Sequence, residues 1–97
     1  MSEPLTATAS VATATPARYA KQLASHLGRR CEVREEEQGT RLLFGGGDCL
    51  LDPREQTLEL RLRAADADQL DRLAGVVGSH LERFGRRNEL HVDWHRA

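Results

Sequence analysis

The chain has 97 residues, 14 basic and 15 acidic side chains, and a formal net charge of -1. Its length is that of one domain, which excludes a cleft between two domains and a barrel enzyme. The near-neutral charge argues against a nucleic-acid binder that works by neutralising phosphates. With 39% hydrophobic and 30% charged residues, the composition is typical of a soluble folded domain.

The start of the sequence is acidic and polar, and no apolar run approaches the roughly 20 residues of a membrane span. The two cysteines, Cys31 and Cys49, fit no disulfide framework or metal-binding spacing. We therefore expect a cytoplasmic protein with free thiols, no cofactor, no nucleic-acid partner and no membrane contact. Residues 1–5 are expected to form a flexible N-terminus, followed by a single domain over residues 6–96.

The first predicted elements are a strand and a helix. Alternating small polar and apolar residues predict a weak strand over 6–13. Thr15 and Pro16 are typical of an N-cap and a first helical position. Apolar side chains at helical spacing continue to Leu27, and Gly28 follows as the expected end of this helix.

Period-two patterns then predict four short strands separated by turns that contain Gly or Pro. These strands cover residues 31–36, 40–44, 48–52 and 57–64. The three consecutive glycines 45–47 favour a hairpin turn, because glycine permits positive φ angles. A phosphate-binding loop is a weaker interpretation, since a strand and not a helix follows.

Asp66 is the predicted N-cap of a second helix that ends near Phe84. Gly75 and Gly78 lie inside this helix, where glycine is unfavourable, so we expect a close approach to a neighbouring element there. The alternation resumes over residues 89–95 and predicts a final strand.

The order strand, helix, four strands, helix, strand predicts an α+β fold. Because the strands alternate apolar and polar residues, one face of the sheet is expected to be buried. Two amphipathic helices can cover that face. The sequence thus predicts a two-layer sandwich with a largely antiparallel sheet and both helices on one face.

Two histidines stand at the edges of the predicted apolar helix faces, His26 in the first helix and His80 in the second. Both helices cover the same sheet, so the two imidazoles can lie near each other. Such a pair could bind a ligand or metal, or transfer a proton in a small enzyme. A hydrogen-bonded histidine at the edge of the core is the structural alternative.

The predicted last strand carries a second group of histidines. His91 and Asp93 lie on one face, about 6.6 Å apart, and could converge on a metal ion. His95 lies about 13 Å from His91 by the same rise, so this strand alone cannot supply three ligands. A solvated polar face with cross-strand ion pairs is the alternative interpretation.

The remaining polar features favour structural roles. Cys31 and Cys49 fall on inward positions and are interpreted as small buried residues. The acidic run 35–37 is interpreted as a solvated strand end that discourages edge pairing. The sequence contains no catalytic Ser-His-Asp pattern or metalloprotease motif.

Several stretches resemble the bacterial domain-of-unknown-function family 2218. They are Arg18–His26 (RYAKQLASH), Ala64–Ala67 (AADA), Val77–Phe84 (VGSHLERF), Glu89–Leu90 and Trp94. The resemblance covers roughly residues 7–96, although members usually carry about one glycine where this chain has three. The family pattern includes four residues that the resemblance marks as candidate ligand-binding positions, without a role: His26, His80, Arg83 and Trp94. The resemblance also implies a small stand-alone protein, with some members associated with iron or siderophore uptake genes.

These observations lead to three hypotheses. The first is a non-catalytic binding or interaction module, whose partner could be another protein or a second copy of the chain. The alternative is an accessory protein that handles a metal or an iron- or siderophore-related ligand. The second alternative is a small enzyme that uses the pair formed by His26 and His80.

Overall fold

A computed structural model describes residues 4–96, except for the side chain of Asn88. Residues 1–3 of the predicted flexible N-terminus lie outside the described residues. Leu5 already belongs to the first strand, where it pairs with Ala64.

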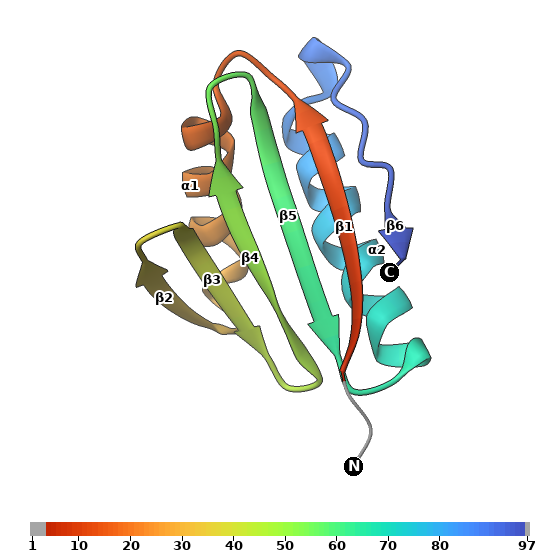
Figure 1. Cartoon of the computed structure of the whole chain (residues 1–97). Coiled ribbons are helices and arrows are strands. Elements are labelled where there is room, and N and C mark those ends of the chain that lie inside the picture. The colour runs from red at the N-terminus through yellow and green to blue at the C-terminus, as the bar shows by residue number, and fades with distance from the viewer. Residues whose placement is uncertain (1–3, 97) are drawn as a thin grey trace.

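The elements follow the predicted order up to the end of the second helix (Figure 1). They are β1 (Leu5–Ala12), α1 (Pro16–Leu27), β2 (Glu32–Glu36), β3 (Gly39–Phe44), β4 (Gly47–Pro53), β5 (Thr57–Ala64), α2 (Ala67–Phe84), a short 3-10 helix η1 (Arg86–Asn88) and β6 (His95–Arg96).

All strand pairs in the sheet are antiparallel, in the order β2-β3-β4-β5-β1-β6. Strands β2 to β5 form a meander of consecutive hairpins. Strand β1 pairs with β5 along its full length and lies between β5 and β6 (Figure 1). The predicted α+β class and antiparallel sheet are confirmed.

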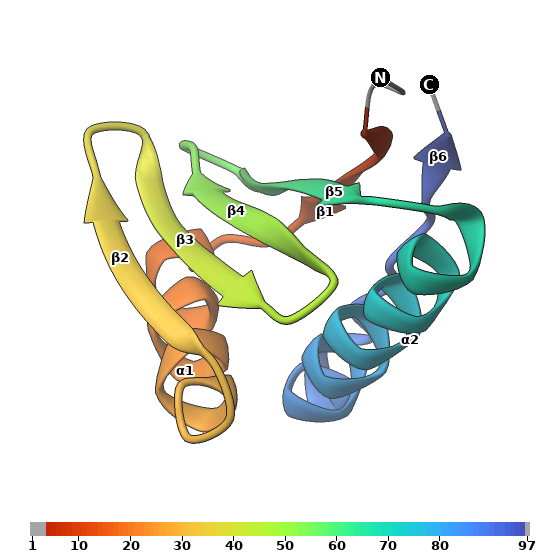
Figure 2. The same ribbon diagram turned by 90° about the horizontal axis from the view of Figure 1, so that it is seen from below.

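Both helices cover the same face of the sheet, as Figure 2 shows. Alternation in β5 explains this arrangement, because Leu58, Leu60 and Leu62 all point to that face and are fully buried. Each such leucine contributes about 1.5–3 kcal/mol through burial. The core lies between the sheet and the two helices, which defines a two-layer sandwich.

The helix ends differ in how their backbone groups are satisfied. Asp66 is the N-cap of α2, since its carboxylate accepts a hydrogen bond from the Gln69 N–H at 2.8 Å. Thr15 precedes α1 but makes no side-chain cap hydrogen bond. Gly28 ends α1 with a right-handed φ of -61°, and a Cβ there would lie 2.6 Å from the Ala24 carbonyl oxygen. Close approach, not positive φ, therefore requires this glycine.

The two glycines inside α2 have different surroundings. A Cβ on Gly78 would lie 3.1 Å from Nε1 of Trp94, which confirms the expected close approach. A Cβ on Gly75 would meet no atom within 4 Å, so the same expectation is wrong there.

The predicted strand over residues 89–95 is wrong for most of its length. Only His95–Arg96 pairs with β1. Leu90 is buried beside Gly85, the Val92 N–H donates to Glu82 Oε2 at 2.9 Å, and the Trp94 indole N–H donates to the Ala74 carbonyl at 3.1 Å. The alternating apolar residues thus pack an extended segment against α2 and do not extend the sheet.

Candidate functional site

The structure brings His26 and His80 together from two different helices. Their ring centroids lie 5.0 Å apart, with the ring planes inclined at 45°. The Phe84 ring stands edge-on to His26 at 5.3 Å and lies 6.4 Å from His80. His26 belongs to the last turn of α1, and His80 lies one turn before Phe84 in α2. The three rings form one cluster where the two helices meet.

A backbone contact orients the His80 imidazole. Its Nδ1 lies 2.7 Å from the carbonyl oxygen of Val76. Because a carbonyl oxygen can only accept, Nδ1 must carry the hydrogen of this bond. In the neutral ring, Nε2 is then the nitrogen that can accept a hydrogen bond or a cation.

Beside the histidine pair lies a cavity of about 500 Å³, which we call the interhelical cavity. It is lined by the C-terminal end of α1 and the residues just after it, by α2 between Gln69 and His80, and by the turn between β3 and β4. Its apolar lining comes from Leu27, Phe44, Leu73 and Val76. The volume lies in the range of roughly 300–1,000 Å³ that is typical of small-molecule sites.

The charged lining of the interhelical cavity has one sign. Arg29, Arg30 and Arg72 line it, and no Asp or Glu among residues 4–96 does. Among the described residues, none of these three guanidinium groups makes an ion pair, in contrast to Arg41 and Arg63 on the sheet. The cavity is therefore locally cationic in a chain of net charge -1.

The β3–β4 turn contributes its backbone to this cavity. Phe44 pairs with Gly47, so Gly45 and Gly46 form a two-residue hairpin turn, as predicted. Neither glycine has a positive φ; a Cβ on Gly46 would instead lie 2.5 Å from Oε1 of Gln69. Glycine permits contact between the turn and α2. The sequence alone does not predict this role, although the run of three glycines is its signal.

The other two residues marked by the family resemblance lie elsewhere. Trp94 packs against Ala74 and Gly78, on the other side of α2 from Val76. Arg83 is exposed, and neither Trp94 nor Arg83 lines the interhelical cavity. Of the four candidate ligand-binding residues, the structure thus brings only the two histidines to one site.

The candidate metal ligands in the C-terminal segment do not converge. His91 Nδ1 lies 3.5 Å from Glu82 Oε2, whereas Asp93 Oδ2 lies 3.8 Å from His95 Nε2. Across residues 4–96, no group of three or more His, Cys, Asp or Glu side chains is placed to hold a metal ion.

The two cysteines are free thiols. Cys49 is fully buried, and burial raises the pKa of its thiol to about 12. Cys31 is half-buried, and its thiol donates to the Leu27 carbonyl oxygen at 3.3 Å. Burial also raises the pKa of Cys31. Both thiols are therefore weak nucleophiles near neutral pH.

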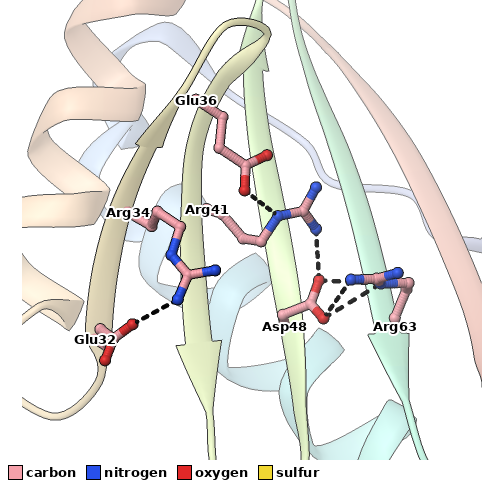
Figure 3. Close-up of polar contacts among 6 residues, drawn as sticks. All are labelled: Glu32, Arg34, Glu36, Arg41, Asp48 and Arg63. Atoms are coloured by element: carbon pink, nitrogen blue, oxygen red, sulfur yellow. Dashed lines mark hydrogen bonds and ion pairs between the residues drawn. The ribbon is translucent and has the colours of Figure 1, made fainter.

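The sheet face that the helices leave uncovered carries a network of ion pairs (Figure 3). Asp48 accepts from Arg41 at 2.7 Å and from Arg63 at 2.9 Å. Arg41 also donates to Glu36 at 2.8 Å, so the network joins β2, β3, β4 and β5. Two carboxylates balance two guanidinium groups, which makes this a structural network and not a cationic binding surface.

A solved structure and a family model are both similar to nearly the whole chain. An NMR structure of PA4090 from Pseudomonas aeruginosa is similar, with a TM-score of 0.77 and 28% sequence identity. The match covers 94% of this chain and 95% of that one. None of the curated proteins is significantly similar to the chain. Within the described residues, no helix has the length and apolar character needed to cross a membrane.

One family pattern matches residues 8–95, which is nearly the whole chain, and it confirms the resemblance seen in the motifs around His26 and His80. The chain belongs to the bacterial family described as an uncharacterized conserved protein, domain of unknown function 2218.

Proposed function

We propose that this protein is a non-catalytic binding module whose ligand occupies the interhelical cavity. The observation that carries the proposal is the convergence of His26 and His80, whose rings lie 5.0 Å apart beside a space of about 500 Å³. Small-molecule sites are concave, with mostly apolar walls and a few polar groups that orient the ligand. A concave space of this size, with apolar and polar groups on its walls, supports a role in binding.

The chemistry of the lining favours binding over catalysis. Its polar side chains are histidine, arginine and glutamine, and within the described part of the chain no carboxylate, hydroxyl or thiol lines it. Proton transfer would depend on His26 and His80, and although the Val76 carbonyl orients His80, no carboxylate of the lining stands beside either ring to activate it. A metal role has less support as well, because the described neighbours of the pair add no third ligand.

A fragment screen by NMR with the isotope-labelled protein tests this proposal. We expect the shifts caused by bound fragments to gather at Phe44, Gly46, Gln69 and Val76, the walls of the cavity. Val76→Phe adds a bulky ring to the apolar wall of the cavity without changing charge, so it should displace the fragments and abolish these shifts. Fragment shifts that lie on the sheet face, or that persist in V76F, would contradict the proposal.

Gly75→Ala is the matched control for V76F. It changes the neighbouring residue of the same helix turn, at a position with open space around it. This variant should bind the same fragments as the unmodified chain. A loss of binding in both variants would point to a general effect on α2.

We further propose a reducing compartment, the bacterial cytoplasm, as the location. Cys31 and Cys49 are both free, and neither is paired in a disulfide. Free buried thiols are usual where glutathione or thioredoxin keeps cysteine reduced.

A further inference from the structure

Resting on the proposed function, we infer that the ligand is a small amphipathic anion. Its apolar body would lie against Phe44, Leu73 and Val76, and its acidic group would be held by Arg72 together with Arg29 or Arg30. A carboxylate and a phosphate ester share this chemistry.

The strongest support comes from Arg72. It is an exposed residue near the start of α2, so the negative C-terminal end of that helix offers it no stabilisation. Asp68 lies four residues earlier, at the spacing that forms ion pairs on helices. No such pair forms, and Arg72 lines the interhelical cavity instead. Arg72 is therefore an unpaired cation on the wall of the cavity, where an external anion can reach it.

Arg29 and Arg30 line the same cavity from another part of the chain. They follow the end of α1 and, like Arg72, have no ion pair within residues 4–96. The helix dipole accounts for basic residues at this end of α1. It does not account for three guanidinium groups around one space without a carboxylate. Guanidinium groups bind carboxylates and phosphates through paired N–H donors, so this arrangement suits an anion.

The walls between the arginines define the rest of the ligand. Leu73 is buried, and Phe44 and Val76 are half-buried, so an apolar body gains by covering them. The Gln69 amide, close to Gly46, adds a neutral hydrogen-bonding group. A ligand that paired only with the arginines would leave this apolar surface exposed to water. The site therefore fits a compound with both an acidic and an apolar part.

A pair of dyes tests the inference directly. The probe is 8-anilinonaphthalene-1-sulfonate, and the matched neutral probe is N-phenyl-1-naphthylamine, which has the same rings without the sulfonate. We expect the anionic dye to bind with one-to-one stoichiometry by fluorescence titration, at least about tenfold more tightly than the neutral dye. Its affinity should fall as sodium chloride is raised, since salt screens the guanidinium groups.

Variants locate the anionic dye and separate the inference from the proposed function. Arg72→Gln should weaken its binding about tenfold and leave the neutral dye unchanged. Arg18→Gln makes the same charge change at an exposed position of α1 outside the cavity, and it should have no effect on either dye. V76F should remove the binding of both dyes.

The outcomes are distinct. Equal affinities for the two dyes, no effect of R72Q and loss of both dyes in V76F would overturn the anion inference and support the binding cavity. Dye binding that persists in V76F would overturn both proposals. Displacement of the anionic dye by benzoate points to a carboxylate ligand, and displacement by inorganic phosphate points to a phosphate ester; either supports the inference.

Discussion

At the scale of single residues, position in the fold sets the chemistry of the side chains. Cys49 faces the core from β4, whereas Cys31 precedes β2 at the edge of the sheet. The thiols belong to one residue type, yet the solvent reaches them to different extents. The same principle applies to the carboxylates, because only some of them lie beside a guanidinium group.

The native protein should react with a thiol reagent at Cys31 only, and slowly. The pKa of Cys49, raised to about 12 by burial, leaves almost no thiolate at pH 8. Labelling with 5,5'-dithiobis(2-nitrobenzoate) at pH 8 should therefore detect one thiol in the folded chain and two in denaturant. In Cys31→Ser, the folded chain should be inert. Rapid labelling of two thiols in the folded state would contradict the burial of Cys49.

Glu36 should make stability depend on pH in the acidic range. Its hydrogen bond with Arg41 lowers the pKa of Glu36 below the ordinary value, so the folded state holds this proton less tightly than the unfolded state. The stabilisation is complete above the ordinary pKa and is lost as the pH falls through the lowered one. Glu36→Gln should thus unfold at lower urea concentration than the unmodified chain at pH 7, and at a similar concentration at pH 3.

The control for this pH dependence is Glu37→Gln. Glu37 is an exposed neighbour with no ion pair in the described part of the chain. Its substitution should leave the urea midpoint unchanged at both pH values. A difference between E36Q and the unmodified chain that is the same at pH 3 and pH 7 would mean that the Arg41 contact does not act through charge.

The proximity of His26 and His80 could be predicted from the sequence, and the arginines of the candidate site could not. His26 and His80 interrupt the edges of apolar helical stripes, which is a pattern that periodicity detects. Arg72 in α2 and Arg29 and Arg30 just after α1 are all exposed. For an exposed arginine, the sequence pattern is the same whether the side chain has an ion-pair partner or lines a cavity. An arginine that is paired can be told from one that lines a cavity only when the three-dimensional positions of the nearby Asp and Glu side chains are known.

At the scale of elements, α2 serves two neighbours at once. One side of the helix meets Trp94 and the C-terminal segment, and another side lines the interhelical cavity. The buried stripe between them, which includes Leu70, Val77 and Leu81, packs on the sheet. Glycine is therefore required by close packing at Gly78 and is not required by packing at Gly75.

Gly75→Ala should stabilise the protein, and Gly78→Ala should not. Alanine is favoured over glycine inside a helix by about 0.5–1 kcal/mol, and nothing lies within 4 Å of a Cβ at Gly75. At Gly78 the added methyl would press on the Trp94 indole and offset that gain. Urea unfolding of the two variants checks this. Equal gains would mean that the indole moves away without cost.

The C-terminal segment shows what an alternating pattern leaves open. Leu90, Val92 and Trp94 alternate with polar residues because one side of an extended segment is covered. The pattern does not reveal whether a sheet or a helix covers it. Here the Glu82 carboxylate takes the Val92 N–H that a neighbouring strand would otherwise have bound.

At the scale of the whole molecule, one core holds both layers together. Strand β5 lies near the middle of the sheet, and its leucines belong to one core cluster with buried residues of both helices. The class of fold followed from periodicity, since it depends on which faces are apolar. The strand order did not, because no local pattern places β1 between β5 and β6. The interhelical cavity likewise depends on how far apart two helices lie, which is a property of the assembled fold.

Leu60→Ala should lower the free energy of unfolding by about 2–5 kcal/mol, the usual cost of a cavity in a core. Leu60 is fully buried in β5. The matched control is Leu5→Ala, at a side chain that is 41% exposed in β1, and its cost should stay below about 1 kcal/mol. Urea denaturation followed by circular dichroism measures both. Similar costs would contradict a core centred on β5.

The place of β1 in the sheet also has a consequence for the order of events during synthesis. Strand β1 leaves the ribosome early, but it pairs only with β5 and β6, which are made after three further strands and after α2, respectively. Because synthesis adds about 5–20 residues per second, the nascent β1 remains unpaired on the order of seconds before β5 has been made. Its composition of Thr, Ala and Ser, with few large apolar residues, suits a strand that must remain solvated and unaggregated until β5 arrives.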